Sequence, residues 1–529
     1  MSVPTIENRG QWGSRFGFIM SAAGSAIGLG NIWRFPYLTG EHGGGAFVFV
    51  YLSIVLLIGV PLLFTEIGLG RLTRKSTIGA FRDTGAGPAW LGFGAVLALL
   101  VSFFVLSYYS VIAGWTIGYV FKSLSGSTST FATFASNPFY TIPLLAVVIA
   151  ITISIVLGGI SGGIEKATKV LMPTLLILIL IVAIRSVTLD GAWEGVVFYL
   201  TPEFSKITAN TILAALGQAF FSLSIGWGIM VTYGSYLSKQ ANIVSSAVWV
   251  GLMDTTVALL AGLMIFPAVF AFGKSPEAGP TLVFQVLPEV FRAIPGGSIV
   301  GAVFFLILMV AAITSTISML EVPASYFIDE KKWKRKKASI LIGVFAFIVG
   351  VPAALSSGGS SYFTNMTLRG LDLNAVAANV EPVNNYYQVV FSDNVKQGKI
   401  DQWESELRDG ADNTFIGVEK SNEQMAFVFL SEASATVFAD KIGNLNRGFL
   451  SILDYYFGTF FIIVVAFSTC VYAGWKMNIK DLVNELGEGS PLFRKAKWAQ
   501  NVYVFFIRYV CPLLVLAVLL NLVGAFSFG

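Results

Sequence analysis

The chain has 529 residues, of which 55% are hydrophobic and 12% are charged, with a formal net charge of +4. Soluble domains carry about 25% charged residues, so this composition excludes an ordinary soluble protein and indicates a chain that crosses a membrane many times. The single histidine, His42, excludes a histidine-based metal cluster. Cys470 and Cys511 both fall in apolar runs, which favours buried thiols over a disulfide or a metal site.

Apolar runs predict about eleven membrane spans, separated by polar connections. They lie near residues 16–38, 45–70, 90–121, 141–158, 166–186, 208–236, 241–272, 297–328, 338–356, 448–475 and 499–526. Basic residues flank alternate ends of the spans, which predicts a multi-pass protein of the cell (inner) membrane with a cytoplasmic N-terminus and an extracytoplasmic C-terminus. The basic run 331–337, KKWKRKK, is compatible with a lipid or nucleic-acid patch, but the alternation favours a topological role at the inner face.

Residues 357–447 form a polar insert in which acids outnumber bases, and the predicted orientation places it outside the membrane. Its alternating stretch 426–438, AFVFLSEASATVF, predicts some packed structure, so we expect a small external cap. The chain thus divides into residues 1–356 with the first nine spans, the insert, and residues 448–529 with the last two.

Two of the predicted spans cannot remain helical through their centres. Residues 24–31, GSAIGLGN, place three glycines in the first span, and each weakens a helix by about 1 kcal/mol relative to alanine. Residues 222–228, SLSIGWG, interrupt the sixth span in a similar way. Lipid cannot satisfy the backbone groups that a break frees. Two breaks five spans apart indicate a five-plus-five inverted repeat with an ion or solute site between them, whereas one glycine-rich helix alone is usually a packing face.

Residues 24–37, GSAIGLGNIWRFPY, followed by GGGAF at 43–47, closely resemble the first-helix signature of the neurotransmitter:sodium symporters. Four further segments match that family in order: PLLFTEIGLGR at 61–71, SYYSVIAGW at 107–115, GQAFFSLSIGWG at 217–228 and AAITSTISMLEVP at 311–323. The resemblance covers nearly all of the chain except the insert. It implies an all-α LeuT-type fold with broken helices 1 and 6, and sodium-coupled uptake of an amino acid or amine by alternating access.

The resemblance implies two sodium sites built from hard oxygen ligands. The first would use the Ala26 carbonyl with Asn31, Ser222 and Asp254, and the second would use the carbonyls of Gly24, Ile27 and Ala311 with the hydroxyls of Thr314 and Ser315. Hydroxyls in membrane helices also commonly bond back to their own helix, which is the alternative for Thr314 and Ser315.

Asp254 lies inside a span, where an acid costs several kcal/mol unless it is compensated. Chloride-dependent members of the family have an amide at this position and a chloride-contacting serine four residues later, whereas this chain has Asp254 and Ala258. We therefore expect Asp254 to ligate sodium and to replace the charge of chloride, so that transport needs no chloride. The alternative is that Asp254 only pairs with a neighbouring helix.

The resemblance also assigns the substrate site. Backbone N–H groups near Leu29 and Gly30, together with Tyr109, would bind a carboxylate. Carbonyls around Ser25, Ala26, Phe221 and Ser224 would bind an ammonium group, and Ser222 is assigned to the same substrate site. Monoamine-carrying relatives have an aspartate where this chain has Gly28, so we expect an amino-acid substrate that brings its own carboxylate.

Side-chain preference is assigned by resemblance to Val105, Phe221, Trp227, Ser315 and Met319. Trp227 resembles glycine-carrying members and would fill much of the pocket, which favours glycine or alanine. If Trp227 turns away, the pocket would admit larger hydrophobic amino acids.

Two gates complete the implied mechanism. Arg34 and Asp454 match an external ion pair above the lid formed by Tyr109 and Phe221, and Arg9 and Asp329 match an internal pair braced by Trp12 and Tyr236. Either pair could instead be an ordinary interfacial salt bridge worth under about 1 kcal/mol. Glu66 resembles a family acid that supports the first helix from behind.

The sequence contains no nucleophile–base pair, metal cluster or phosphate loop in register, so we do not expect an enzyme. A sodium-dependent amino-acid sensor, in which the insert contacts a partner, is the alternative to a transporter. The expected partners are an amino acid, about two sodium ions and the lipid bilayer, with no nucleic acid, and the expected state is a monomer or weak dimer.

Overall fold

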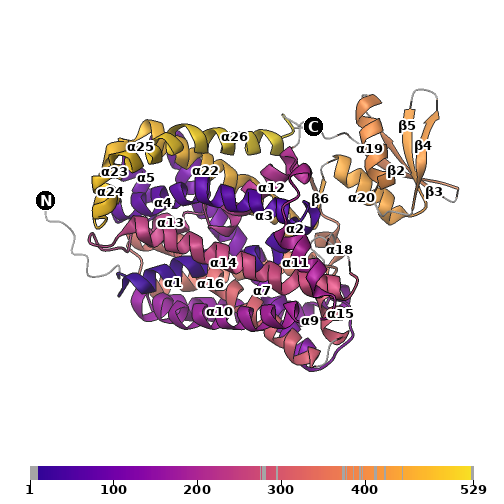
Figure 1. Ribbon diagram of the computed structural model, residues 1–529, viewed down its shortest axis with the longest axis horizontal. Helices are drawn as coiled ribbons and strands as arrows, with labels where there is room; N and C mark the ends of the chain where they lie inside the picture. The colour runs from indigo at the N-terminus through magenta and orange to yellow at the C-terminus, as the bar shows by residue number, and fades with distance from the viewer. Residues whose placement is uncertain are drawn as a thin grey trace.

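The computed structural model describes residues 10–525, apart from residues 275, 277–281, 294–295, 372–375, 377, 385, 392–394, 396, 410–413, 422–423 and 444. Most of this chain forms a bundle of long helices that run along one axis, with a smaller module beyond one end (Figure 1). Nine helices of the described residues are long and apolar enough to cross a membrane, namely Gly45–Thr73, Pro88–Leu124, Pro138–Leu157, Ile160–Val187, Ile243–Ala271, Gly297–Lys331, Arg335–Leu355, Phe449–Lys476 and Lys497–Leu522.

Two interrupted helices account for the remaining predicted spans. The first is α1 (Arg15–Ala26) followed by Gly30–Glu41, two pieces that bend by 49° and together pass as a tenth span. The second is α12 (Ala209–Ser222) followed by α13 (Ile229–Gly234), each too short to span alone. Both predicted breaks are therefore present in the fold.

Several of the spans consist of more than one helical segment. The elements used below are η2 (Gly30–Arg34), α2 (Phe35–Glu41), α3 (Gly45–Ile54), α4 (Val60–Thr73), α5 (Thr77–Asp83), α7 (Leu97–Leu124), α9 (Pro138–Leu157), α10 (Lys166–Val187), α11 (Ala192–Leu200), α14 (Ile243–Ala271), α15 (Leu287–Ala293), α16 (Gly297–Lys331), α17 (Arg335–Leu355), η9 (Asp454–Phe460), α22 (Phe461–Val471), α23 (Ile479–Gly487) and α26 (Cys511–Leu522).

Local backbone geometry explains both breaks. Ile27 leaves the helical region with ψ of 101°, and the chain becomes helical again at the π-helical turn η2. In the second break, Ser224, Gly226 and Gly228 have φ of +54°, +84° and +71°. Glycine adopts this left-handed region without a steric penalty, so the glycines of the SLSIGWG segment serve the break directly.

The two ends of the bundle differ in character. The start of α1 and the ends of α4, α13 and α16 lie at one end, together with α23 (Figure 1). We call it the basic end, because Arg71 and Lys331 lie in the last turns of α4 and α16 and Lys239 follows α13. The short helices α2, α15 and α18 (Ser361–Thr364) lie at the other end with the insert, which we call the insert end. α1 starts at the basic end and α26 finishes at the insert end (Figure 1).

The insert folds as a module with its own sheet and core. β1 (Thr367–Arg369) pairs antiparallel with β6 (Leu445–Arg447) where the chain leaves and re-enters the bundle. The strands β2 (Ala378–Val383), β3 (Tyr386–Phe391), β4 (Phe415–Ser421) and β5 (Gln424–Phe429) form an antiparallel sheet in the order β2-β3-β5-β4, packed with α19 (Gln397–Asp409) and α20 (Glu432–Gly443).

A separate apolar core holds this module together. Phe391 and Phe427 from the sheet pack against Trp403 of α19 and Phe438 of α20. The stretch 426–438, which predicted packed structure, forms β5 and the first part of α20. The helical prediction therefore describes the membrane part, while the insert adds strands that were not assigned from the sequence.

Candidate functional site

Polar side chains from four elements meet beside the break in α1. The Ser222 Oγ lies 2.9 Å from each carboxylate oxygen of Asp254. The Asn31 Nδ2 donates to Asp254 Oδ1 at 2.8 Å and to Ser222 Oγ at 2.9 Å. The Tyr51 hydroxyl donates to Asp254 Oδ2 at 3.2 Å. All four side chains are buried, and these donors compensate the carboxylate for the loss of water.

This cluster brings together Asn31, Ser222 and Asp254, which the family resemblance assigned to one sodium site. Ala26, whose carbonyl was assigned to the same site, is the last residue of α1 and borders the break. Tyr51 was not predicted from the sequence as a site residue. Its signal was a hydroxyl-bearing aromatic in α3, a largely apolar helix.

The residues assigned to the second sodium site lie where the break in α1 approaches α16. The Thr314 hydroxyl donates to the Ala311 carbonyl at 2.9 Å, and Ser315 Oγ lies 3.2 Å from the same carbonyl. A Cβ added to Gly24 would lie 3.4 Å from the Thr314 Cβ, so α1 passes directly beside this hydroxyl. Ile27 marks the point where α1 stops. Both hydroxyls bond to their own helix, but each oxygen keeps lone pairs that can coordinate a cation.

The predicted substrate residues surround the same break. Tyr109 OH accepts a hydrogen bond from the Leu29 N–H at 2.9 Å. A Cβ on Gly30 would lie 2.8 Å from the Phe221 ring, so the backbone of the first break touches the second interrupted helix. Ser224 Oγ donates to the Ser25 carbonyl at 3.0 Å. These contacts join the two breaks to each other and to Tyr109.

Ser318 also belongs to this region, although the sequence analysis did not name it. Its hydroxyl lies 2.7 Å from Ser25 Oγ and donates to the Ser315 carbonyl at 2.8 Å. The signal was its position three residues after Ser315, on the same face of α16.

Gly28 is tightly enclosed by two of the predicted substrate residues. A Cβ at this position would lie 2.7 Å from both the Tyr109 hydroxyl and Ser315 Oγ. Any larger side chain would therefore displace one of these groups. Packing therefore requires a glycine at position 28 in this structure. The resemblance had singled out the same position because monoamine-carrying relatives have an aspartate there.

Trp227 is directed into the protein and not toward lipid. Its side chain is 2% exposed, and its ring meets the Phe221 ring edge-on with centroids 5.4 Å apart. The Ser102 hydroxyl fixes the Trp227 carbonyl with a 2.7 Å hydrogen bond. Val105 and Met319 are buried in the same core. The contact with Phe221 places the indole beside a predicted substrate residue.

At the insert end, Arg34 and Asp454 do not form the predicted ion pair in the part of the chain that the structure describes. The Arg34 guanidinium lies over the Phe221 ring, with Cζ 4.9 Å from the centroid. Asp454 accepts a 2.7 Å hydrogen bond from the Tyr108 hydroxyl. In this structure the two charged groups therefore make two separate contacts, one with Phe221 and one with Tyr108. Tyr108 was not predicted as a gate residue.

At the basic end, Trp12 and Tyr236 are in contact, as the predicted bracing requires. The Trp12 N–H donates to the Tyr236 carbonyl at 3.3 Å, and its indole Nε1 donates to the Tyr233 carbonyl at 2.9 Å. The Tyr236 hydroxyl donates to Glu321 at 2.6 Å, and Glu321 pairs with Arg335 at 2.6 Å.

The predicted internal ion pair is only partly within the described chain. Asp329 accepts a hydrogen bond from the Ser76 N–H at 2.6 Å, which holds α16 to the start of α5. Arg9 lies outside the described residues.

Glu66 contacts the break in the second interrupted helix, whereas the prediction placed it behind the first helix. Its Oε1 accepts a 2.8 Å hydrogen bond from the Gly226 N–H, in the second interrupted helix. The expectation that Glu66 backs the first helix is therefore corrected, because the close approach of α4 to the second break brings the carboxylate to Gly226.

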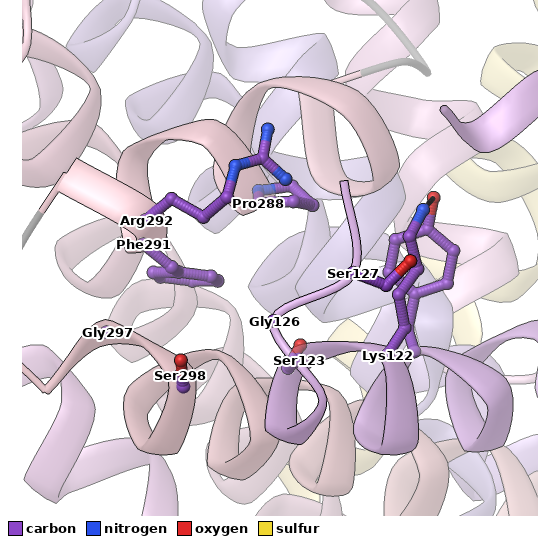
Figure 2. Close-up of a pocket in the computed structure, with 10 residues that line it drawn as sticks. Lys122, Ser123, Gly126, Ser127, Pro288, Phe291, Arg292, Gly297 and Ser298 are labelled. Atoms are coloured by element: carbon purple, nitrogen blue, oxygen red, sulfur yellow. Dashed lines mark hydrogen bonds between the residues drawn. The ribbon is translucent and has the colours of Figure 1, made fainter. Parts of the chain in front are cut away.

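A small cavity of about 30 Å³ lies at the insert end between α7, α15 and α16 (Figure 2). Lys122 and Arg292 line it together with serines such as Ser123 and Ser298. None of the predicted site residues lines this cavity, so it is separate from the region between the breaks.

Comparison with known proteins adds independent findings. The model of the sodium:neurotransmitter symporter family matches residues 9–137 and 133–397. A sodium-dependent transporter of Bacillus subtilis, YhdH, is 45% identical over 357 residues, which cover 66% of this chain and 79% of YhdH. A sodium-dependent transporter of Haemophilus influenzae is 39% identical over 384 residues, covering 69% of this chain and 83% of the relative.

A more distant relative and a solved structure extend the comparison. The sodium-dependent serotonin transporter of Drosophila melanogaster is 27% identical over 410 residues, covering 67% of this chain and 65% of that protein. The crystal structure of MhsT in complex with L-phenylalanine superposes with a TM-score of 0.73 at 34% identity, covering 97% of this chain and all of that one (100%).

Proposed function

The chain belongs to the sodium:neurotransmitter symporter family and is a sodium-dependent, multi-pass membrane symporter, and we propose that it imports a small neutral amino acid, glycine or alanine, without chloride. The observation that carries this proposal is the buried Asp254 carboxylate beside the break in α1, held by the neutral donors Asn31, Ser222 and Tyr51. Among the described residues no basic side chain bonds to Asp254, and a buried negative charge of this kind suits a cation that binds and leaves.

The first sodium ion binds among Ala26, Asn31, Ser222 and Asp254. Hydroxyl, carbonyl and carboxylate oxygens are the ligands that a hard cation prefers. Asn31 Oδ1 now accepts from the Gly28 N–H at 3.1 Å while its Nδ2 faces Asp254, so the amide turns over to offer its oxygen to the ion. With Ala258 in place of a chloride-contacting serine, Asp254 supplies the negative charge within the site itself.

The second sodium ion binds between the carbonyls of Gly24, Ile27 and Ala311 and the hydroxyls of Thr314 and Ser315. The approach of α1 to Thr314 supports this assignment, because both sets of oxygens border the same gap. This ion would tie α1 to α16. Its loss would free the basic half of α1 from the neighbouring helix.

The substrate carboxylate binds at Tyr109 and the N–H groups of Leu29 and Gly30, and its ammonium group binds among the carbonyls near Ser25 and Ser224. The Leu29 N–H already donates to the Tyr109 hydroxyl, so these groups are preoriented around one position. Gly28 leaves no room for an aspartate, which supports a substrate that carries its own carboxylate.

The size of the substrate follows from Trp227. Its contact with Phe221 supports a pocket that accepts glycine or alanine. A larger hydrophobic amino acid is the second candidate, because MhsT, which is similar over nearly all of this chain, was crystallised with L-phenylalanine. The two candidates differ only in whether the indole occupies the volume that a large side chain needs.

Alternating access requires that one end of the bundle be closed while the other opens. We assign the basic end to the cytoplasm, because membrane proteins keep their basic loops there, and the insert end to the outside. Trp12 and Tyr236 close the cytoplasmic mouth, while Arg34, Phe221 and Tyr109 form the outer lid. Sodium binding favours the outward-facing state by differential affinity.

Uptake by purified protein in liposomes, driven only by a sodium gradient, tests this function. We expect concentrative uptake of glycine or alanine in both chloride and gluconate media. Uptake that falls to background in gluconate would remove the role given to Asp254. Preferred uptake of phenylalanine or leucine would support the second candidate. Sodium-dependent binding without any uptake would instead support an amino-acid sensor.

A further inference from the structure

Arg71, near the basic end of α4, is fully buried and joins three segments of the chain. Its Nε donates to Glu485 Oε1 in α23 at 2.7 Å, while the other guanidinium nitrogens donate to the backbone carbonyls of Glu485 and Ala241. Lys239 completes the network with a 2.7 Å bond to Glu485 Oε2. Arg71 is 0% exposed and Glu485 3% exposed, so these charges depend on one another. We call these four residues the Arg71 network.

The segment anchored by this network is the end of the second interrupted helix. Ala241 and Lys239 belong to the connection that follows α13 and leads into α14. A Cβ on Gly70 would overlap the Val231 carbonyl, and a Cβ on Gly234 would overlap the Ile67 carbonyl. The backbones of α4 and α13 therefore touch directly, and the Arg71 network fastens the connection to the same unit.

Trp12 packs against the end of α13, which belongs to this unit of α4, α13 and the following connection. Trp12 donates to the carbonyls of Tyr233 and Tyr236, and Tyr236 precedes Lys239 by only three residues. A shift of the anchored connection would therefore displace the Tyr233 and Tyr236 carbonyls that accept hydrogen bonds from Trp12. None of the hydrogen bonds of Arg71 in the described chain reaches a predicted sodium or substrate residue, so any effect of Arg71 on transport would act through α13.

We propose that Arg71 is a positioning residue for the gate at the basic end. It fixes α13 to α4 and α23, so that the surface of α13 under Trp12 stays in place. The gate then opens only when Trp12 moves away from this surface. The inference rests on the gating role proposed for Trp12 and Tyr236. Without the Arg71 network, the surface under Trp12 moves and the basic end opens even when sodium is bound.

Cysteine labelling measures the opening of this end directly. Cys470 and Cys511 are replaced by alanine, and the reporter is Ser21→Cys on the basic half of α1, where Ser21 is buried. The test variant is Arg71→Met with Glu485→Leu, which removes both charges and leaves apolar side chains in their place. Purified protein in sodium and without any amino acid is treated with a maleimide well below its unfolding temperature. We expect the labelling rate to rise about fivefold or more.

Arg82→Met is the matched control, because Arg82 forms an ion pair with Glu330 at the same end but is 48% exposed. Its labelling rate should equal that of the parent protein. Lys239→Met, which removes only one contact of the network, should give a smaller rise. If the double variant does not fold, Lys239→Met and Glu485→Gln carry the test.

A lower unfolding temperature with an unchanged labelling rate would show that Arg71 serves stability alone and would overturn the proposal. The assay contains no substrate, so a failure of glycine or alanine uptake leaves its result intact. A failure of the Arg71 proposal can therefore be told apart from a failure of the proposed amino-acid uptake.

Discussion

The Ser222 hydroxyl lies 2.9 Å from both carboxylate oxygens of Asp254, although Ser222 ends α12 and Asp254 lies in α14, with α13 between them in the chain. This contact joins the end of α12, where the second break begins, to the middle of α14. A buried carboxylate thereby becomes part of the region between the two breaks. The first prediction concerns its charge.

Asp254→Asn should lower sodium-driven uptake by about 10- to 100-fold or more, because the site loses its only carboxylate among the assigned ligands. Adding Ala258→Ser should restore part of the uptake, and only in chloride medium. Uptake is compared in chloride and gluconate for both variants. Equal uptake of the single variant and the parent protein in gluconate would contradict the proposed charge replacement.

Tyr51→Phe tests the hydroxyl that the sequence analysis missed. Loss of its hydrogen bond to Asp254 should raise the sodium concentration for half-maximal uptake by about 10- to 150-fold, since bonds to charged groups are worth about 1.5–3 kcal/mol. Tyr199→Phe is the control. The Tyr199 hydroxyl donates to the backbone carbonyls of Ala258 and Leu259 in α14, the helix of Asp254, and not to the Asp254 carboxylate. A similar change in both variants would indicate a general packing effect.

Gly28→Ala should weaken amino-acid binding, because the added Cβ lies 2.7 Å from the Tyr109 hydroxyl and Ser315 Oγ. Overpacking of this kind costs about 1–3 kcal/mol, equivalent to a loss of affinity of about 5- to 150-fold. Gly217→Ala on α12 is the control, because a Cβ there meets nothing within 4 Å. Binding is measured by isothermal titration in sodium. Unchanged affinity for the Gly28 variant would show that the substrate lies elsewhere.

Trp227→Leu should admit leucine to the site and reduce the preference for glycine, because a smaller side chain frees volume beside Phe221. Trp249→Leu on α14 is the control, since Trp249 is 50% exposed on the outer surface. A thermal-shift panel of amino acids in sodium reports the change, because a ligand stabilises the state that it binds. Tighter binding of leucine or phenylalanine than of glycine by the parent protein would refute the small-pocket argument.

The sequence by itself determined the spans, both breaks and the family, because each depends on local composition or on a contiguous motif. Long apolar runs must lie in lipid, and glycines at 24–30 and 226–228 weaken a helix wherever it lies. Contacts between distant segments required the tertiary structure. Only the packing of α3 against α14 brings Tyr51 to Asp254, and only the approach of α4 to the second break brings Glu66 to Gly226.

The same distinction explains the gate at the insert end. The family resemblance implied an ion pair between Arg34 and Asp454. In the described chain the Arg34 guanidinium lies over the Phe221 ring, and Asp454 accepts a hydrogen bond from Tyr108. Residue identity determined which groups have the chemistry for binding and gating, while the packing of the helices decided which of those groups meet.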